Sequence, residues 1–337
     1  MTGAWRGGDY TAAGDAWAHA ADDVTAHALR LLTTEHDLTA PGGEATAPVP
    51  RPLVPGGEAT ALVSRPLVLG DDATAPGVAD QAPGPLAPAG ATATPRVLDV
   101  GTGSGPAALA AARSGARVTG LDLEPGLLRT AGERARRAGL ADRTRFVVGD
   151  ARRLPFRYGA FDAVLSTFGV MFAPGAARVA AELVRVCRPG GVVAVASWTP
   201  DGVFGRVAPT ATRHLDRAPD PEPPTRWGEP AHVRGWFGPL PVTLRTEVVH
   251  VRVTYPSVEH AVAAFADKPG PLRAHRAARE ALGRWDAARA ALAELFAAHD
   301  RAGDGTLAMD VPYLLATARV RARHPRAAGC GGSRRSP

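Results

Sequence analysis

A short apolar strand that runs into a glycine-rich turn constrains this chain more than any other feature. Residues 97–105 read VLDVGTGSG, and Pro106 follows directly. Glycine lets the backbone adopt positive φ angles and approach a ligand closely, while proline fits the first turn of a helix. The pattern therefore predicts a buried strand, a tight turn and a helix, with the turn as a cradle for a cofactor.

The segment from residue 96 to residue 198 alternates short apolar runs with amphipathic stretches. The apolar runs are RVLDV, RVTGLD, RFVVGD, FDAVLST and VVAVASW. Strands separated by helices favour a parallel sheet with right-handed crossovers, and continuous apolar strands indicate that helices cover both faces. We therefore expect a doubly wound α/β domain.

The spacing around the turn separates several kinds of cofactor site. A dinucleotide fingerprint wants a small residue where Pro106 stands, and a phosphate-binding loop wants a lysine followed by serine or threonine. Asp122 ends the second strand, where a carboxylate can accept hydrogen bonds from both ribose hydroxyls. Asp99 inside the first strand and Asp150 at the end of the third favour an adenosyl ligand, because a carboxylate at the third strand end can accept from an adenine amine.

With these features the chain resembles the class I S-adenosylmethionine-dependent methyltransferases, and among them the small-molecule group similar to the ubiquinone and menaquinone biosynthesis methyltransferases. The resemblance rests on LDVGTGSG, VTGLDLEPGLL, VVGDARRLPF, FDAVLSTFGVMFAP and RPGG. It implies a mostly parallel seven-stranded sheet with an antiparallel last strand. The last two strands would be residues 243–255 and 313–320, with residues 257–305 inserted between them.

The resemblance also implies which residues hold the cofactor. The three glycines of the turn would face the methionine part, Asp99 its amino group, Asp122 the ribose, Asp150 with Ala151 the adenine, and Ser166 with Thr167 the sulfonium. The full expected set is Asp99, Gly101, Thr102, Gly103, Gly105, Asp122, Leu123, Asp150, Ala151, Ser166 and Thr167. Two positions depart from the family pattern, namely Glu124 in place of serine or threonine, and Gly175 in place of an aspartate.

The implied activity is transfer of a methyl group from S-adenosylmethionine to oxygen, nitrogen or carbon of a small molecule, mainly by positioning and desolvation. No histidine stands in a recognisable catalytic or metal-binding spacing, so the sequence assigns no catalytic residue; His214, just after the fifth helix-flanked strand, is the best placed. Two alternatives stay open. One is an NAD-dependent oxidoreductase, and the other is a non-catalytic adenosyl-binding or regulatory protein.

The segments outside this core have distinct compositions. Residues 1–37 contain a helical pattern over 11–34 and form an expected N-terminal cap. Residues 38–93 carry a 14-residue tandem repeat rich in proline and glycine, which predicts a disordered linker. The methyltransferase domain then spans 94–322, with 199–227 and 257–305 as lid insertions, and 323–337 form a disordered basic tail.

Charge, cysteine content and hydropathy exclude other function classes. The net charge of +6 equals the arginines of the last nineteen residues, Arg319, Arg321, Arg323, Arg326, Arg334 and Arg335, so the body is nearly neutral and nucleic acid is not an expected partner. Cys187 and Cys330 are too few for a disulfide framework or a metal cluster, which fits a cytoplasmic protein. No apolar stretch is long enough for membrane insertion, and the first residues lack the pattern of a secretory signal.

Overall fold

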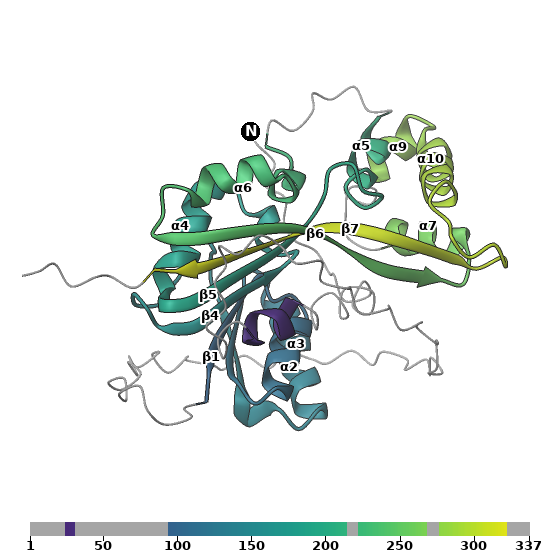
Figure 1. Ribbon diagram of the computed structural model, residues 1–337. Helices are drawn as coiled ribbons and strands as arrows, with labels where there is room; N and C mark the ends of the chain where they lie inside the picture. Colours follow the sequence, from purple (N-terminus) through teal and green to yellow (C-terminus); the bar gives the residue numbers. More distant parts are fainter. Residues whose placement is uncertain (1–23, 31–93, 214–221, 268–275, 322–337) are drawn as a thin grey trace, which may run out of the picture. The chain divides into compact units, whose positions relative to one another are not determined.

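The computed structural model describes residues 24–30, 94–213, 222–267 and 276–321 (Figure 1). These residues all belong to one compact unit of the chain. The repeat linker, the basic tail, residues 1–23 and 31–37 of the predicted cap, and His214 lie outside the described residues.

Seven strands form a single sheet in the order β3-β2-β1-β4-β5-β7-β6. Strands β1 to β5 pair in parallel, and β7 is antiparallel to both β5 and β6. The predicted α/β fold, with a mostly parallel sheet and an antiparallel last strand, is therefore confirmed. The strands are β1 Arg96–Val100, β2 Arg117–Asp122, β3 Thr144–Val148, β4 Phe161–Thr167, β5 Cys187–Trp198, β6 Val242–Tyr255 and β7 Leu307–Val320.

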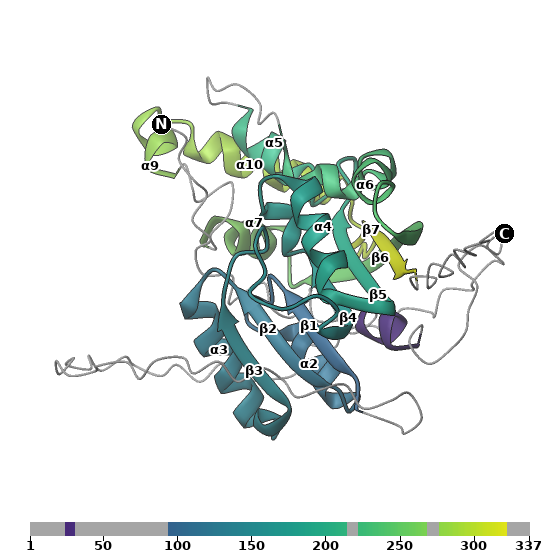
Figure 2. The ribbon, with the colours of Figure 1, turned by 90° about the vertical axis from the view of Figure 1, so that its left-hand side faces the viewer.

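Helices cover both faces of the sheet, with α2 and α3 on one side and α4 and α6 on the other (Figures 1 and 2). The central strands are mostly apolar and mostly buried, because helices cover both of their faces. No helix among the described residues is long and apolar enough to cross a membrane. The helices are α2 Pro106–Arg113, α3 Pro125–Arg137, α4 Ala176–Val186, α5 Val207–Thr212, α6 Pro230–Phe237, α7 Val258–Asp267, α9 Arg276–Ala281 and α10 Trp285–Ala297, with short 3-10 turns η1 Ala141–Arg143, η2 Val170–Phe172 and η3 Pro224–Gly228.

The described part of the N-terminal cap, residues 24–30, is helical, and Val24 and Ala28 are buried in the main core. His27 is close enough to Glu247 and to Arg245 of β6 for their charges to act on its pKa, which burial lowers. Arg234 of α6 donates to Thr246, the residue between those two. Since successive residues of a strand point to opposite faces, the 24–30 helix covers the face of β6 opposite α6.

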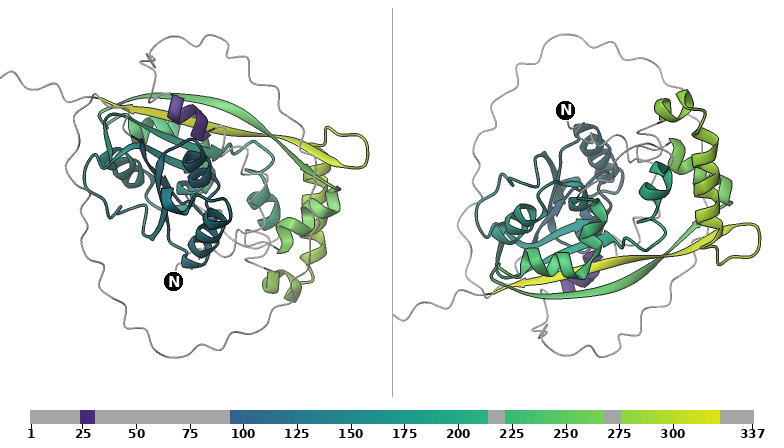
Figure 3. Two further views of the ribbon diagram at one scale, coloured as in Figure 1. Left: turned by 90° about the horizontal axis from the view of Figure 1, so that it is seen from below. Right: turned by 90° about the horizontal axis from the view of Figure 1, so that it is seen from above.

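The β6–β7 pair extends beyond the rest of the sheet. The two strands pair over all fourteen residues, but β7 pairs with β5 only from Tyr313 to Arg319. Residues 307–312 and 250–255 therefore continue as a two-stranded ribbon, and Pro312 is tolerated in β7 because that side of the ribbon has no strand neighbour. Figure 3 shows this ribbon leading to the insertion helices, among which α10 packs against both α5 and α7.

One predicted boundary is wrong for a local reason. The last strand begins at Leu307 rather than Tyr313, because Pro312 and the ribbon hide its first half from the alternation pattern. Helices α9 and α10 are separate helices, and Gly283 between them has a φ of 63°. Cys187 opens β5, and its burial raises the pKa of the thiol to about 12.

The central strands should dominate the stability of the fold. Leu165 of β4 is fully buried, so Leu165→Ala should lower the free energy of unfolding by about 2–5 kcal/mol through lost contacts and a residual cavity. Val248 of β6 is 52% exposed, so Val248→Ala should change it by less than about 0.5 kcal/mol. Urea unfolding of both variants checks this, and equal losses would contradict the layering described above.

Candidate cofactor site

The glycine turn is tied to the neighbouring strand by its own backbone. The amides of Gly101 and Thr102 both donate to the carbonyl of Leu121 in β2, at 2.8 and 3.0 Å. The glycines of the turn have positive φ angles, 68° at Gly101, 55° at Gly103 and 89° at Gly105. Side chains with a Cβ rarely adopt such angles, so the turn needs the residues that the sequence supplies.

Asp99 anchors the turn from below. Its side chain is 1% exposed, and one carboxylate oxygen accepts from the Thr102 hydroxyl at 2.6 Å and from the Ala108 amide of α2 at 3.1 Å. Burial raises the pKa of this carboxyl to about 6, against which the two hydrogen bonds act. In the ligand-free protein Asp99 thus holds the strand, the turn and the following helix together.

Asp122 joins the end of β2 to the same turn. One of its oxygens accepts from the Gly103 amide at 2.8 Å, and the other accepts from the Glu124 amide at 3.0 Å. Burial raises the pKa of this carboxyl as well. Glu124 caps α3 by accepting from the Gly126 amide at 3.2 Å, so the departure from serine at this position keeps a cap.

The residue after Asp122 presents an apolar surface to solvent. Leu123 is 65% exposed, although it follows directly on a buried strand. Beside the turn, a Cβ placed on Gly103 would meet no atom within 4 Å. The tip of β2 therefore offers carboxylate acceptors, an apolar side chain and open space next to a backbone turn.

Asp150 follows β3 and is held by its neighbour Arg152. The guanidinium donates to Oδ2 at 2.9 Å from Nε and 2.6 Å from Nη2, and to Oδ1 at 3.1 Å from Nε, and this lowers the pKa of Asp150. Ala151, between them, is half-buried. The loop that carries all three residues is in turn bound by α4, because the Arg178 guanidinium donates to the Arg152 carbonyl at 2.8 Å.

An ion pair on α4 fixes the rest of this loop. Glu182 accepts from the Leu154 amide at 2.8 Å, while Arg185 donates to the carbonyls of Leu154 and Phe156 at 2.9 and 2.7 Å. The two side chains also pair with each other at 2.7 Å. The sequence analysis did not identify this pair. The available signal was an acid and a base three residues apart in a helical pattern, because such residues are neighbours on a helix surface.

Ser166 and Thr167 end β4 on the other side of the turn. The Ser166 hydroxyl is fully buried, donates to the Val100 carbonyl at 2.8 Å and accepts from the Val170 amide at 3.0 Å. Its hydroxyl therefore joins β4 to β1. The buried Thr167 hydroxyl has no hydrogen-bond partner among the described residues.

The loop after β4 approaches the glycine turn backbone to backbone, a contact that sequence reasoning did not find. A Cβ on Gly101 would lie 2.7 Å from the Cα of Gly169, and a Cβ on Gly169 would lie 2.6 Å from the Gly101 carbonyl oxygen. Real Cβ atoms do not come so close to backbone. Both positions therefore require glycine. The segments that follow β1 and β4 are in direct backbone contact here.

Aromatic side chains pack behind this contact. Phe168 has a φ of 59°, and its ring stacks on Trp198 of β5 with centroids 3.6 Å apart. Tyr313 of β7 and Phe204 meet this pair edge-on. Phe168 and Met171 are thus core residues, whereas Phe172 is 37% exposed.

The strand order brings these residues to one edge of the sheet. Going outward from β1, Asp122 and Asp150 follow β2 and β3 on one side, and Ser166 and Thr167 end β4 on the other. Chain order reverses between β1 and β4, which is where ligands bind in open α/β sheets. The described residues contain no group of three histidine, cysteine or acidic side chains placed to hold a metal ion.

Comparison with known proteins agrees with this arrangement. Residues 98–195 match the family described as "Methyltransferase domain". An uncharacterized protein of Mycobacterium tuberculosis is 44% identical over 166 residues, which are 48% of this chain and 60% of the relative. A sterol 24-C-methyltransferase of Gibberella zeae is 38% identical over 110 residues, or 32% of this chain and 29% of that protein.

The chain thus spans less than two thirds of the length of the curated relatives that it matches. The solved structure of the YcgJ protein from Bacillus subtilis has a TM-score of 0.48 and 17% identity, and the match covers 68% of this chain and 93% of that one. Residues 98–195 are thus similar to a methyltransferase domain, and the sheet has the mostly parallel order with an antiparallel last strand that the resemblance implied.

The close approach at the turn makes a stability prediction. Gly169→Ala should lower the free energy of unfolding by about 1–3 kcal/mol, because backbone atoms of Gly101 must move to admit the new Cβ. Gly235→Ala in α6 is the matched control: a Cβ there meets nothing within 4 Å, so helix propensity should make it neutral or stabilising by up to about 1 kcal/mol. Urea unfolding measures both, and a Gly169→Ala variant as stable as wild type would argue against the contact.

Asp99 should give the fold a distinctive pH dependence. Its folded pKa of about 6 lies above its ordinary value of 3.8, so folding favours the protonated form and ionisation opposes it. The contribution is therefore fully present below pH 3.8 and is lost as the pH rises to about 6, with a total on the order of 3 kcal/mol.

The Asp99→Asn variant isolates this contribution from the other carboxylates. The difference in unfolding free energy between variant and wild type should move in favour of the variant between pH 4 and pH 6. Urea unfolding at several pH values gives the difference. Parallel curves would show that Asp99 does not titrate in this range.

Proposed function

We propose that this protein transfers the methyl group of S-adenosylmethionine to a small-molecule acceptor. The observation that carries the proposal is the junction of Asp122 with the Gly103 amide, which places a carboxylate inside a glycine turn at the point where strand order reverses. The match of residues 98–195 to a methyltransferase domain supports it, as does the relative named a sterol 24-C-methyltransferase.

The residues at the strand ends suit an adenosyl group. The backbone bonds to Asp122 leave acceptor capacity toward the ribose, since a carboxylate can accept about four hydrogen bonds. Exposed Leu123 offers an apolar face to a purine, and the open side of Gly103 leaves room for a ligand next to the backbone. Asp150 and Ala151 would border the adenine, while Asp99, Thr102 and the glycines would lie beneath the methionine part.

When bound, S-adenosylmethionine supplies a methyl group on a positively charged sulfur, which a nucleophile displaces in line. The protein's task is then to hold the acceptor collinear with that bond and to exclude water. Positioning of this kind can contribute up to about 7–11 kcal/mol. A general base is needed only for acceptors that must lose a proton, so methyl transfer does not by itself require one in the site.

The two insertions would form the cover over the acceptor. Their described parts pack together, because α5 from the first insertion contacts α10 from the second. The Arg279 guanidinium of α9 also donates to the Ala211 carbonyl of α5. We propose that the described parts of residues 199–227 and 257–305 lie above the strand ends, in the lid role that the sequence predicts for these insertions.

Replacing Asp122 tests this function. Asp122→Ala should weaken binding of S-adenosylhomocysteine about 10- to 100-fold, the effect of losing hydrogen bonds to a charged group. Asp142→Ala, at an exposed site in η1, should bind it as wild type does. Isothermal titration calorimetry gives both affinities, and thermal shifts with S-adenosylmethionine and NAD complete the test. Stabilisation by NAD alone would contradict the proposed methyl transfer and favour the alternative, an NAD-dependent oxidoreductase.

A further inference from the structure

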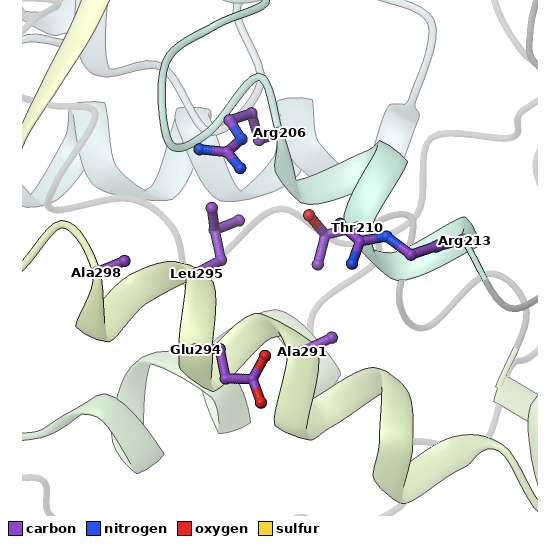
Figure 4. A pocket seen from close by; sticks show the side chains of 7 residues that line it. All are labelled: Arg206, Thr210, Arg213, Ala291, Glu294, Leu295 and Ala298. Atoms are coloured by element: carbon purple, nitrogen blue, oxygen red, sulfur yellow. The ribbon is translucent and has the colours of Figure 1, made fainter.

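A pocket of about 210 Å³ lies between α5 and α10, that is, between the two insertions (Figure 4). On the α5 side it is lined by Arg206, Thr210 and Arg213, spaced so that all three fall on one face of the helix. The α10 side contributes an apolar wall with one acid at its edge, formed by Ala291, Glu294, Leu295 and Ala298.

The α5 side of the pocket offers hydrogen-bond donors without protein acceptors. Thr210 is only 5% exposed, and Figure 4 shows its hydroxyl directed into the pocket. Arg206 and Arg213 form no ion pair within the part of the chain that the structure describes. Their guanidinium groups therefore have N–H donors to offer to a ligand oxygen or to water.

The charges select the kind of ligand. Two arginines and one glutamate give the lining a net charge of one positive unit. Guanidinium groups match the geometry of carboxylates, and the facing wall of Leu295, Ala291 and Ala298 suits an apolar body. The volume is below the roughly 300–1,000 Å³ of pockets for drug-sized ligands, so it fits a small acid or one end of a larger one.

The pocket follows closely on the end of β5. A Cβ on Gly205 would collide with the Thr199 carbonyl, so the chain packs onto the end of β5 immediately before Arg206. Only β4 separates β5 from β1, so the ends of these two strands lie about 10 Å apart at 4.8 Å per strand.

We propose that this pocket binds the carboxylate end of the methyl acceptor, and that the acceptor is a small organic acid with an apolar body. The role of the bound acid as methyl acceptor rests on the proposed function, methyl transfer. The pocket's preference for a carboxylate rests only on Arg206, Thr210 and Arg213.

Benzoate and benzyl alcohol, which share an apolar ring but differ in charge, are the probes. Titrated into the full chain saturated with S-adenosylhomocysteine, benzoate should bind at least about 10-fold more tightly than benzyl alcohol. Arg206→Gln should weaken benzoate about 10-fold, and Arg206→Gln with Arg213→Gln should abolish the preference. Glu294→Gln should tighten benzoate binding, because it removes a negative charge from the lining.

Arg289→Gln is the matched control, since Arg289 is an exposed arginine of α10 that does not line the pocket. It should leave both affinities unchanged, and melting curves should show that every variant is folded. Equal binding of benzoate and benzyl alcohol, or a double variant that binds benzoate as wild type does, overturns the proposal.

The same titrations separate this inference from the proposed function. If the chain binds S-adenosylhomocysteine but shows no preference for benzoate, the carboxylate-binding role of the pocket is contradicted and the proposed methyl transfer is not. An arginine-dependent preference for benzoate in a chain that does not bind S-adenosylhomocysteine removes the acceptor assignment and leaves an anion site.

Discussion

The backbones of Gly101 and Gly169 lie so close that neither residue has room for a side chain, and the arrangement of the candidate site depends on this contact. It presses the loop after β4 onto the turn after β1. The Ser166 hydroxyl spans the same gap by bonding to both sides. Asp99 bonds within the turn and to α2, and Asp122 holds the turn from the end of β2, so the end of β2, the start of α2 and the end of β4 all restrain residues 97–105.

The neighbouring strand ends are restrained in a different way. The loop after β3 is held through its backbone by charged side chains of α4, and its Leu154 is buried in the core. On the other side, Phe168 has a left-handed backbone conformation, and its ring stacks on Trp198. These contacts help to offset the conformational entropy that each loop loses when it is ordered.

The strands and the turn were predictable because their signals are local. Apolar runs separated by amphipathic stretches predict buried strands and helices, and the positive φ angles of the turn follow from its glycines. The pairing of Gly169 with Gly101 and the grip of Glu182 and Arg185 on the loop join residues far apart in the chain. The spacing of apolar residues along the chain carries no information about such long-range contacts. The extended part of β7 was missed because Pro312 is a strand breaker in any local analysis and is permitted only where a neighbour is absent.

The β6–β7 ribbon has a consequence for how this fold can change. The insertion helices α7, α9 and α10 leave from one end of the ribbon and return to it, while its other end is built into the sheet. This segment is thus carried on a stem of two strands that pair with each other over fourteen residues. Neither strand of the stem pairs with β1, so a change in the length of residues 257–305 does not pass directly to the strand that leads into the glycine turn, and the two regions can vary independently within one domain.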